Sequence, residues 1–145
     1  MIRGSPSHVD LTVTDLARSV GFYDRVLGRL GYRRLDEAGA GAPCWAHGDG
    51  GGAFFSIALQ PAQAGRPAHD RRASGLHHLA FHAADRDDVD DFHAFLLDSG
   101  ITVLDSPAEY PYTPSYYAVF FADPDGLKLE LVFEPALRAR AGAAG

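Results

Sequence analysis

Hydrophobic and polar residues alternate along several short stretches of the chain, and the last of these stretches is the most regular. The odd-numbered positions from Leu127 to Phe133 are apolar, whereas Lys128 and Glu130 fall between them. A period of two is typical of a β-strand with one buried face. Glu130 therefore lies in the middle of a predicted strand, on the face opposite the apolar residues. A carboxylate in that position is either solvated or directed into a cavity.

Patterns of hydrophobic and polar residues along the whole chain predict two helices and eight strands. Apolar residues at spacings of three and four follow the N-capping candidates Thr14, Asp15 and Asp85, which predicts helices ending near Leu30 and Ser99. The predicted strands cover residues 8–13, 32–36, 44–47, 53–59, 76–83, 101–104, 116–122 and 127–133. Loops are expected at residues 37–43 and 106–115, where Gly, Ala, Pro and Tyr are frequent.

The order of elements in the first half of the chain repeats in the second half. Aligning His8 with His78, an offset of 70 residues, also aligns Asp15 with Asp85. An internal repeat of this kind indicates two copies of one structural unit. Each copy has the order strand, helix and three strands, so the sequence predicts two βαβββ modules.

These modules define the predicted domain organisation and fold class. One domain over residues 7–134 would contain module one (7–60), a linker without periodicity (61–75) and module two (76–134), followed by a flexible C-terminal tail (135–145). The expected class is α+β. Pairing the modules would form an open, curved mixed sheet, a half-barrel with helices outside and a cleft inside.

Charge and composition exclude several classes of function. The net charge of −6 argues against nucleic-acid binding, which requires a basic patch. No apolar run approaches the roughly 20 residues that span a membrane. A single cysteine, Cys44, and the lack of a signal-peptide pattern predict a cytoplasmic protein. The arginines of the linker, among them Arg71 and Arg72, belong either to a solvated loop or to a contact with an anionic substrate.

Three residues form a candidate metal site. His8 and His78 occupy equivalent positions in the two modules, and Glu130 lies on the last strand. Two imidazoles and one carboxylate suit a divalent transition metal and leave coordination positions for substrate and water. The alternative is that both imidazoles bond to their neighbours and that Glu130 is solvated.

The chain resembles the vicinal oxygen chelate superfamily, which includes glyoxalase I, extradiol dioxygenases, fosfomycin-resistance and bleomycin-resistance proteins. The resemblance covers about residues 8–134 and is carried by His8, Gly28 and Gly31 and by the segments VTDL (13–16), SVGFY (19–23), GLHHLAF (75–81) and FADPDGLKLE (121–130). It implies paired βαβββ modules. It also implies one divalent ion (Fe, Mn, Zn or Ni) held at the positions of His8, His78 and Glu130.

The sequence departs from this family's pattern on the fourth strand. Four-ligand members have Glu or Gln there, and the matching residue is Ser56 by strand face or Ile57 by alignment on Pro61. Gln60 shares a face with Ser56 but would need a register shift to reach the site. Neither Ser56 nor Ile57 can act as the carboxylate base that a glyoxalase I reaction needs. That reaction and the related epimerase reaction of the family are therefore disfavoured. Phe120 stands where extradiol dioxygenases have a tyrosine, which disfavours that reaction too.

Other residues are candidates for catalysis and substrate binding. His82 shares a face with His78 and is expected to transfer protons, unless it is an ordinary rim histidine. Tyr117 is a second catalytic candidate. Strand alternation allows only one of Tyr116 and Tyr117 to face the cleft. The residues expected to bind substrate are Ser56, Tyr116 and Lys128.

These observations predict a metalloenzyme that acts on a small substrate chelated through two vicinal oxygens. Lyase, isomerase, dioxygenase and transferase chemistry all remain open. The alternative is a non-catalytic protein that binds a small molecule, as bleomycin-resistance proteins do. The expected partner is a small-molecule substrate, with no nucleic acid and no membrane, and the resemblance implies a homodimer.

Overall fold

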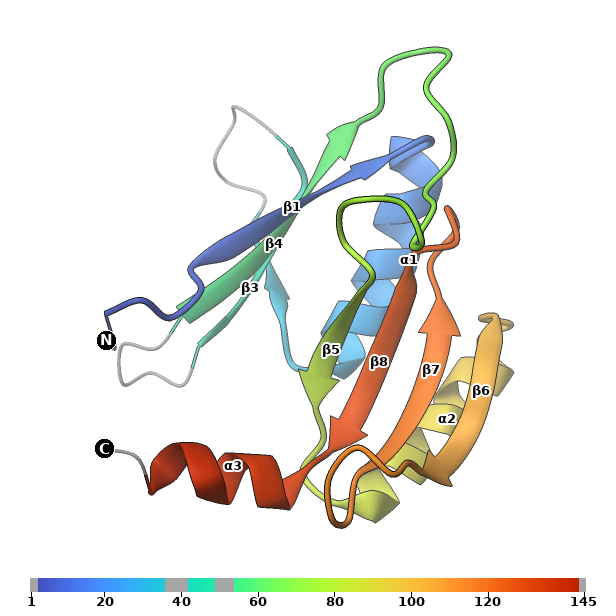
Figure 1. Ribbon diagram of the computed structural model, residues 1–145. Helices are drawn as coiled ribbons and strands as arrows, with labels where there is room; N and C mark the ends of the chain where they lie inside the picture. The colour runs from blue at the N-terminus through green and yellow to red at the C-terminus, as the bar shows by residue number, and fades with distance from the viewer. Residues whose placement is uncertain (1–2, 36–41, 49–53, 144–145) are drawn as a thin grey trace. The chain divides into compact units, whose positions relative to one another are not determined.

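The computed structural model of the protein describes residues 3–35, 42–48 and 54–143 (Figure 1). The chain divides into two compact units, Met1–Ala68 and His69–Gly145, which we call unit one and unit two. The boundary between them falls inside the predicted linker. Most of the loop predicted at residues 37–43 lies outside the described residues.

Unit one is a four-stranded mixed sheet with one helix. The elements are β1 (His8–Val13), α1 (Leu16–Arg29), β2 (Arg33–Arg34), β3 (Cys44–Gly48) and β4 (Phe54–Pro61). The strand order is β1-β4-β3-β2, in which β1 and β4 are parallel and the other pairs are antiparallel.

Local sequence signals explain where α1 begins and ends. The side chain of Asp15 accepts a hydrogen bond from the backbone N–H of Arg18, which caps the first turn. Gly31 follows the helix with a φ of +84°, a left-handed conformation that favours glycine. The buried residues of the helix recur at spacings of three and four, as an amphipathic helix requires: Ser19, Phe22, Tyr23, Val26 and Leu27.

Unit two repeats this arrangement and adds a helix. The elements are β5 (His78–His82), α2 (Arg86–Asp98), β6 (Val103–Glu109), β7 (Tyr117–Ala122), β8 (Lys128–Phe133) and α3 (Pro135–Gly142). The strand order is β5-β8-β7-β6, with β5 parallel to β8 and the other pairs antiparallel. Figure 1 shows α2 against one face of this sheet and α3 extending from the end of β8.

The core of unit two lies between α2 and the sheet. Phe92 of α2 contacts Phe121 of β7, with ring centroids 5.4 Å apart. Leu129 and Leu131 of β8 are fully buried, as the alternating pattern predicts. Because these residues fill the helix side, the residues that alternate with them, Lys128 and Glu130, occupy the other face of the sheet.

The α+β class and the two βαβββ modules are confirmed. Three elements differ from the prediction. Strand β2 is only two residues long, and β6 continues to Glu109 through Pro107, because an edge strand tolerates a proline. Residues 135–142 form α3 where a flexible tail was expected. Pro135 at its first turn and the Ala, Leu and Arg residues after it favour a helix.

Within the described residues, no helix combines the length and the apolar character needed to cross a membrane.

Candidate metal centre

Glu130 is the buried carboxylate around which the site of unit two is built. It lies in the middle of β8, opposite Ala80 of β5 and Phe120 of β7. Its exposed fraction is 0%. Burial raises the pKa of Glu130 above its ordinary value, although a hydrogen bond from Tyr116 and the charge of Lys128 act in the opposite direction.

One oxygen of Glu130 accepts a hydrogen bond from a tyrosine. The hydroxyl of Tyr116 donates to Oε1 of Glu130 at 2.5 Å. Burial, followed by this hydrogen bond, raises the pKa of Tyr116, so the hydroxyl keeps its proton and remains a donor. The apolar surroundings are Ala118, Phe120 and Val132, against which Tyr110 and Tyr116 pack. They account for the desolvation of the carboxyl group.

The other oxygen of Glu130 faces His78. Oε2 of Glu130 lies 3.1 Å from Nε2 of His78. Oε2 nevertheless has no hydrogen-bond partner, so this approach lacks the geometry of a hydrogen bond. Burial, followed by the charges of Lys128 and Arg71, lowers the pKa of His78 and favours the neutral imidazole. A buried carboxylate oxygen without a donor, next to a neutral imidazole nitrogen, fits two ligands of a divalent ion.

His77 supports the same arrangement from the neighbouring position. Its Nδ1 lies 2.7 Å from Nδ1 of His78. When His78 donates across this contact, its proton is on Nδ1, and the lone pair of Nε2 is directed toward Glu130. A metal-ligating histidine commonly donates its other N–H to a second group in this way. Neighbouring residues of a strand point to opposite faces, so the sequence did not suggest this contact.

The third predicted ligand, His8, belongs to unit one. It begins β1 opposite Ser56 of β4, and its Nδ1 lies 3.3 Å from the hydroxyl of Ser7. Among the described residues, no three His, Cys, Asp or Glu side chains gather in a cluster that could hold a metal. The structure thus brings together His78 and Glu130, two of the three predicted ligands, within one unit.

The register of β4 shows which residue of unit one has the position that Glu130 has in unit two. Glu130 pairs with Ala80, two positions after His78, and Ala58 pairs with Asp10, two positions after His8. Ala58 is therefore the counterpart of Glu130. Neither Ser56 nor Ile57 has that position, and Ser56 corresponds instead to Lys128. The conclusion that this position carries no ligand side chain is unchanged.

Gln60 is directed toward another residue of unit one. Its Nε2 donates to Oδ2 of Asp10 at 2.9 Å. The amide therefore has a partner on the neighbouring strand.

His82 has a carboxylate neighbour that the alternation along the strands did not predict. Its Nδ1 lies 3.7 Å from Oε1 of Glu134, which is longer than a hydrogen bond. The side chain of His82 is 63% exposed and that of Glu134 is 14% exposed. The two histidine–carboxylate pairs, His78–Glu130 and His82–Glu134, have the same separation of 52 positions. Because Glu134 directly follows β8, the strand parallel to β5, that equal spacing could have identified it.

The two tyrosines at the start of β7 lie on opposite sides of the sheet. The hydroxyl of Tyr117 donates to Oδ1 of Asp90 on α2 at 2.7 Å, and the guanidinium of Arg86 lies over its ring. Tyr117 is thus on the helix side, away from Glu130, contrary to the expectation that it takes part in the chemistry. Tyr116 bonds to Glu130 itself, whereas it was expected to bind substrate.

Comparison with known proteins identifies the family. The sequence model of the Glyoxalase/Bleomycin resistance protein/Dioxygenase superfamily matches residues 5–131. The chain belongs to this superfamily. The resemblance found in the sequence is therefore confirmed.

Individual relatives agree with this assignment. YqjT of Bacillus subtilis (strain 168) and YaeR of Escherichia coli (strain K12), both uncharacterized, are each 34% identical over 128 residues, which is 86% of this chain and 95% and 92% of theirs. A crystal structure from Bacillus halodurans, provisionally named a glyoxalase, is 32% identical with a TM-score of 0.72, covering 90% of this chain and 96% of that one. A glyoxalase/bleomycin resistance protein/dioxygenase domain from Frankia is 25% identical, with a TM-score of 0.66 and coverage of 92% and 98%.

Proposed function

We propose that this protein is a metalloenzyme that holds one divalent ion with His8, His78 and Glu130. Its substrate would be a small molecule that binds the ion through two vicinal oxygens. The observation that carries this proposal is Oε2 of Glu130, which is buried, has no hydrogen-bond partner and lies 3.1 Å from Nε2 of His78. Leaving a buried polar atom without a partner is costly, so such atoms indicate a missing ligand or a functional role.

A bound divalent ion would supply Lewis acidity, which stabilises negative charge that develops on a substrate oxygen. The residues of the chain would orient the substrate and neutralise part of the ion's charge. Glu130 offsets part of the ion's charge, and Tyr116 holds Oε1 so that Oε2 remains available. His82 would accept or return the substrate proton, and Glu134 would orient its ring. Because Ala58 takes the place of a carboxylate in unit one, that position offers no general base. The metal is expected among Fe, Mn, Zn and Ni.

Elemental analysis of the natively purified protein, followed by calorimetric titration with Ni²⁺ and Zn²⁺, tests this proposal. Wild type should bind about one ion per chain, and His8→Ala should weaken binding by at least about 100-fold, as expected when one of three ligands is removed. His47→Ala is the matched control. His47 lies on β3, on the same face of the strand as the buried Trp45, and its ring contacts that of Tyr32. Wild-type protein that binds none of the proposed metals would contradict the proposal.

A second function is favoured by the tyrosines around β6 and β7. Tyr110 and Tyr112 stack with centroids 5.8 Å apart and an interplanar angle of 4°, and Tyr112 is 65% exposed. An exposed aromatic surface suits a protein that binds an aromatic or cationic ligand without turnover. That function predicts ligand binding that survives EDTA and the substitution His78→Ala.

A further inference from the structure

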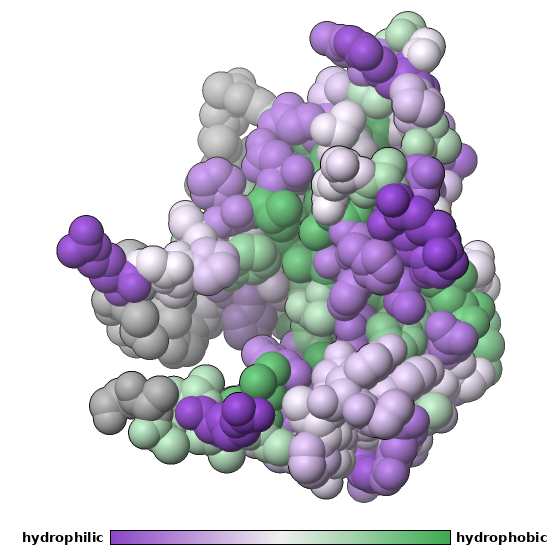
Figure 2. Space-filling model, viewed as in Figure 1, coloured by the Kyte–Doolittle hydropathy of each residue, from purple (hydrophilic) through white to green (hydrophobic). Residues whose placement is uncertain are grey.

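Tyr116, which donates to Glu130, ends a short loop between β6 and β7. Residues 110–116 form this loop, which lies at the bottom of the view in Figure 1 and gives a pale surface there in Figure 2, because Tyr, Thr, Ser and Pro have intermediate hydropathies. Two backbone hydrogen bonds close it: Tyr110 N–H donates to the carbonyl of Tyr116 at 3.0 Å, and Tyr116 N–H donates to that of Thr113 at 3.2 Å. The direction of the Tyr116 side chain therefore depends on how this loop is held.

Ser115, directly before Tyr116, has an unfavourable backbone conformation. Its φ is +63°, and in the described part of the chain it is the only residue other than glycine with a positive φ. A side chain in this left-handed region costs free energy, so such a conformation persists only where surrounding contacts fix the backbone. The contacts that fix it lie at the two ends of the loop.

Arg86, the first residue of α2, contacts both residues that flank the loop. Its guanidinium pairs with the carboxylate of Glu109, the last residue of β6. Its Cζ also lies 4.8 Å from the ring centroid of Tyr117, the first residue of β7. Glu109 and Tyr117 are Cα partners across the antiparallel pair β6–β7. Arg86 therefore joins the two strands at the point where the loop leaves the sheet and re-enters it.

The contacts on the helix side determine where Tyr116 points on the other side. Neighbouring side chains of a strand point to opposite faces, so a Tyr117 ring that is fixed against α2 directs Tyr116 toward Glu130. The hydroxyl of Tyr117 also donates to Asp90, one helical turn after Arg86. Loss of that bond alone leaves both contacts of Arg86 in place, whereas loss of Arg86 separates the two ends of the loop.

These contacts serve position more than stability. The side chains of Arg86 and Glu109 are 42% and 66% exposed. An ion pair with this exposure contributes little to the free energy of unfolding. A guanidinium is planar, however, so it holds a carboxylate and an aromatic ring in a fixed relative orientation.

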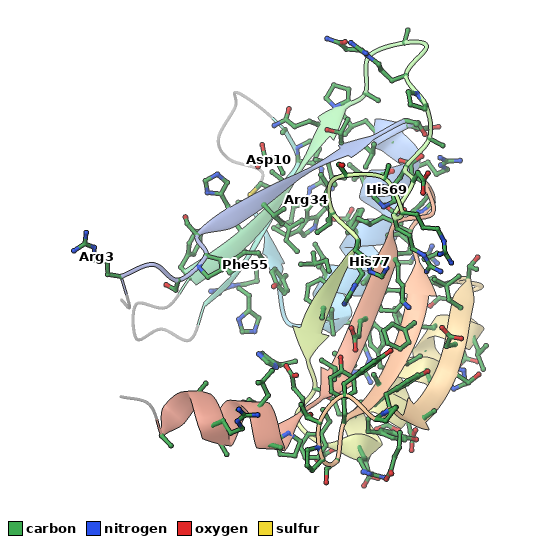
Figure 3. The ribbon with its side chains drawn as sticks, viewed as in Figure 1. Arg3, Asp10, Arg34, Phe55, His69 and His77 are labelled. Atoms are coloured by element: carbon green, nitrogen blue, oxygen red, sulfur yellow. The ribbon has the colours of Figure 1, made fainter. Side chains whose placement is uncertain are left out.

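Unit one contains the same combination of contacts without a carboxylate ligand to position. Arg34 (Figure 3) pairs with Asp24 at 2.9 Å, and its Cζ lies 5.5 Å from the ring centroid of Trp45. Ala58 has the position in this unit that Glu130 has in unit two. Arg34 is therefore a matched control for Arg86.

We propose that Arg86 is a positioning residue: by joining the two ends of loop 110–116, it holds the Tyr116 hydroxyl at Oε1 of Glu130. Its effect on metal binding rests on the proposed function, in which Tyr116 holds Oε1 and leaves Oε2 to the ion. The coupling between Arg86 and Tyr116 is a property of the metal-free protein and does not rest on that function.

The first test observes the Tyr116 hydroxyl in full-length protein without metal. A hydroxyl proton in a short, charge-assisted hydrogen bond exchanges slowly with water and gives a downfield proton NMR resonance. Tyr116→Phe identifies this resonance by its loss. We expect it in wild type and in Arg34→Gln, and we expect it to broaden or disappear in Arg86→Gln at the same pH.

The second test is a double-mutant cycle of Arg86→Gln and Tyr116→Phe, measured as Ni²⁺ affinity by calorimetry. Arg86→Gln should weaken Ni²⁺ binding about threefold when Tyr116 is present, which is the scale of an exposed ion pair. In the Tyr116→Phe background it should have no effect, because the group through which it acts is gone. Arg34→Gln should leave Ni²⁺ affinity unchanged in both backgrounds.

Two results would overturn the inference. One is a Tyr116 resonance that is unchanged in Arg86→Gln or missing from the wild type. The other is an equal change of Ni²⁺ affinity with and without the Tyr116 hydroxyl, which is the behaviour of a merely structural residue. Failure of the proposed function is distinguishable, because it appears as a lack of Ni²⁺ binding by the wild type. The resonance then decides the inference by itself.

Discussion

The two units share one strand order but differ on the face of the sheet that α1 or α2 does not cover. In unit two, the central strand β8 presents Glu130, with Phe120 as its partner on the next strand. In unit one, the equivalent position on β4 is Ala58, and its partner on β3 is Cys44. Where unit two has a buried carboxylate beside an aromatic ring, unit one therefore has two small residues, Ala58 and Cys44.

The helix-facing side shows the opposite behaviour. Ile57 and Leu59 in unit one and Leu129 and Leu131 in unit two are all fully buried. Large apolar residues on this face contribute to the core of each unit, so replacing them costs stability. Side chains on the other face do not fill this core, so they can be replaced at a lower cost in stability. The comparison indicates that the duplicated fold is maintained by one face while the chemistry varies on the other.

The most severe test of this difference is Glu130→Gln. The amide keeps the shape of the side chain and can still accept from Tyr116, but it removes the proposed carboxylate ligand. We expect at least about 100-fold weaker metal binding by calorimetry, because no other carboxylate ligand is proposed. Ser56→Ala in unit one is the control and should change metal affinity by no more than about twofold. Comparable losses in both variants would remove the distinction between the units.

A smaller effect is expected from Tyr116→Phe. Without the hydroxyl, Oε1 of Glu130 loses its donor, so the pKa of the carboxyl should rise further and the ionised ligand becomes less available. Metal affinity near neutral pH should fall about tenfold, as for other groups that orient a ligand. Calorimetry over a range of pH should show the loss diminishing as pH rises. Tyr117→Phe, which breaks the bond to Asp90, should leave metal affinity unchanged.

Unit one has its own polar network, whose loss should affect stability alone. Oδ1 of Asp24 accepts from Nε1 of Trp45 at 2.9 Å, and Oδ2 pairs with Arg34. Asp24→Ala leaves the indole N–H of the buried Trp45 without this acceptor, which should cost about 1–2 kcal/mol in urea unfolding. The partly exposed ion pair adds little. A change in metal affinity in this variant would contradict a purely structural role.

The smallest expected effect concerns the stability of the metal-free protein. Because folding raises the pKa of Glu130, its contribution to stability is present below the ordinary carboxyl range and is lost as pH rises through the raised value. Glu130→Gln cannot ionise. In EDTA it should therefore become more stable than wild type as pH rises, by about 1 kcal/mol or about 3 °C in Tm. Thermal unfolding at several pH values measures this, and a constant difference across the range would contradict it.

Much of the fold was predictable because its signals are local. Alternation of period two located β1 and β8, and Asp15 and Asp85 cap the helices that they were predicted to start. The helix α3 was missed, because a short segment of helix-forming residues without an apolar face gives no periodic signal.

The site was predictable only in part. Alternation placed His78 and Glu130 on one face, and the structure brings their side chains within 3.1 Å. The same alternation did not distinguish Tyr116 from Tyr117. Nor could alternation identify the unit-one counterpart of Glu130, because Ser56 and Ala58 share a face and only the hydrogen-bonded register separates them.

For this protein, the sequence by itself determined the repeat, the faces of the strands and the family, since all three depend on the order of residues along the chain. Only the tertiary structure decided which atoms meet. Tyr116 reaches one oxygen of Glu130, His78 faces the other, and Lys128 stands beside both, because strand pairing joins segments up to 52 positions apart. The carboxylate that the alternation left either solvated or enclosed is fully buried, with one oxygen bonded and one without a hydrogen-bond partner.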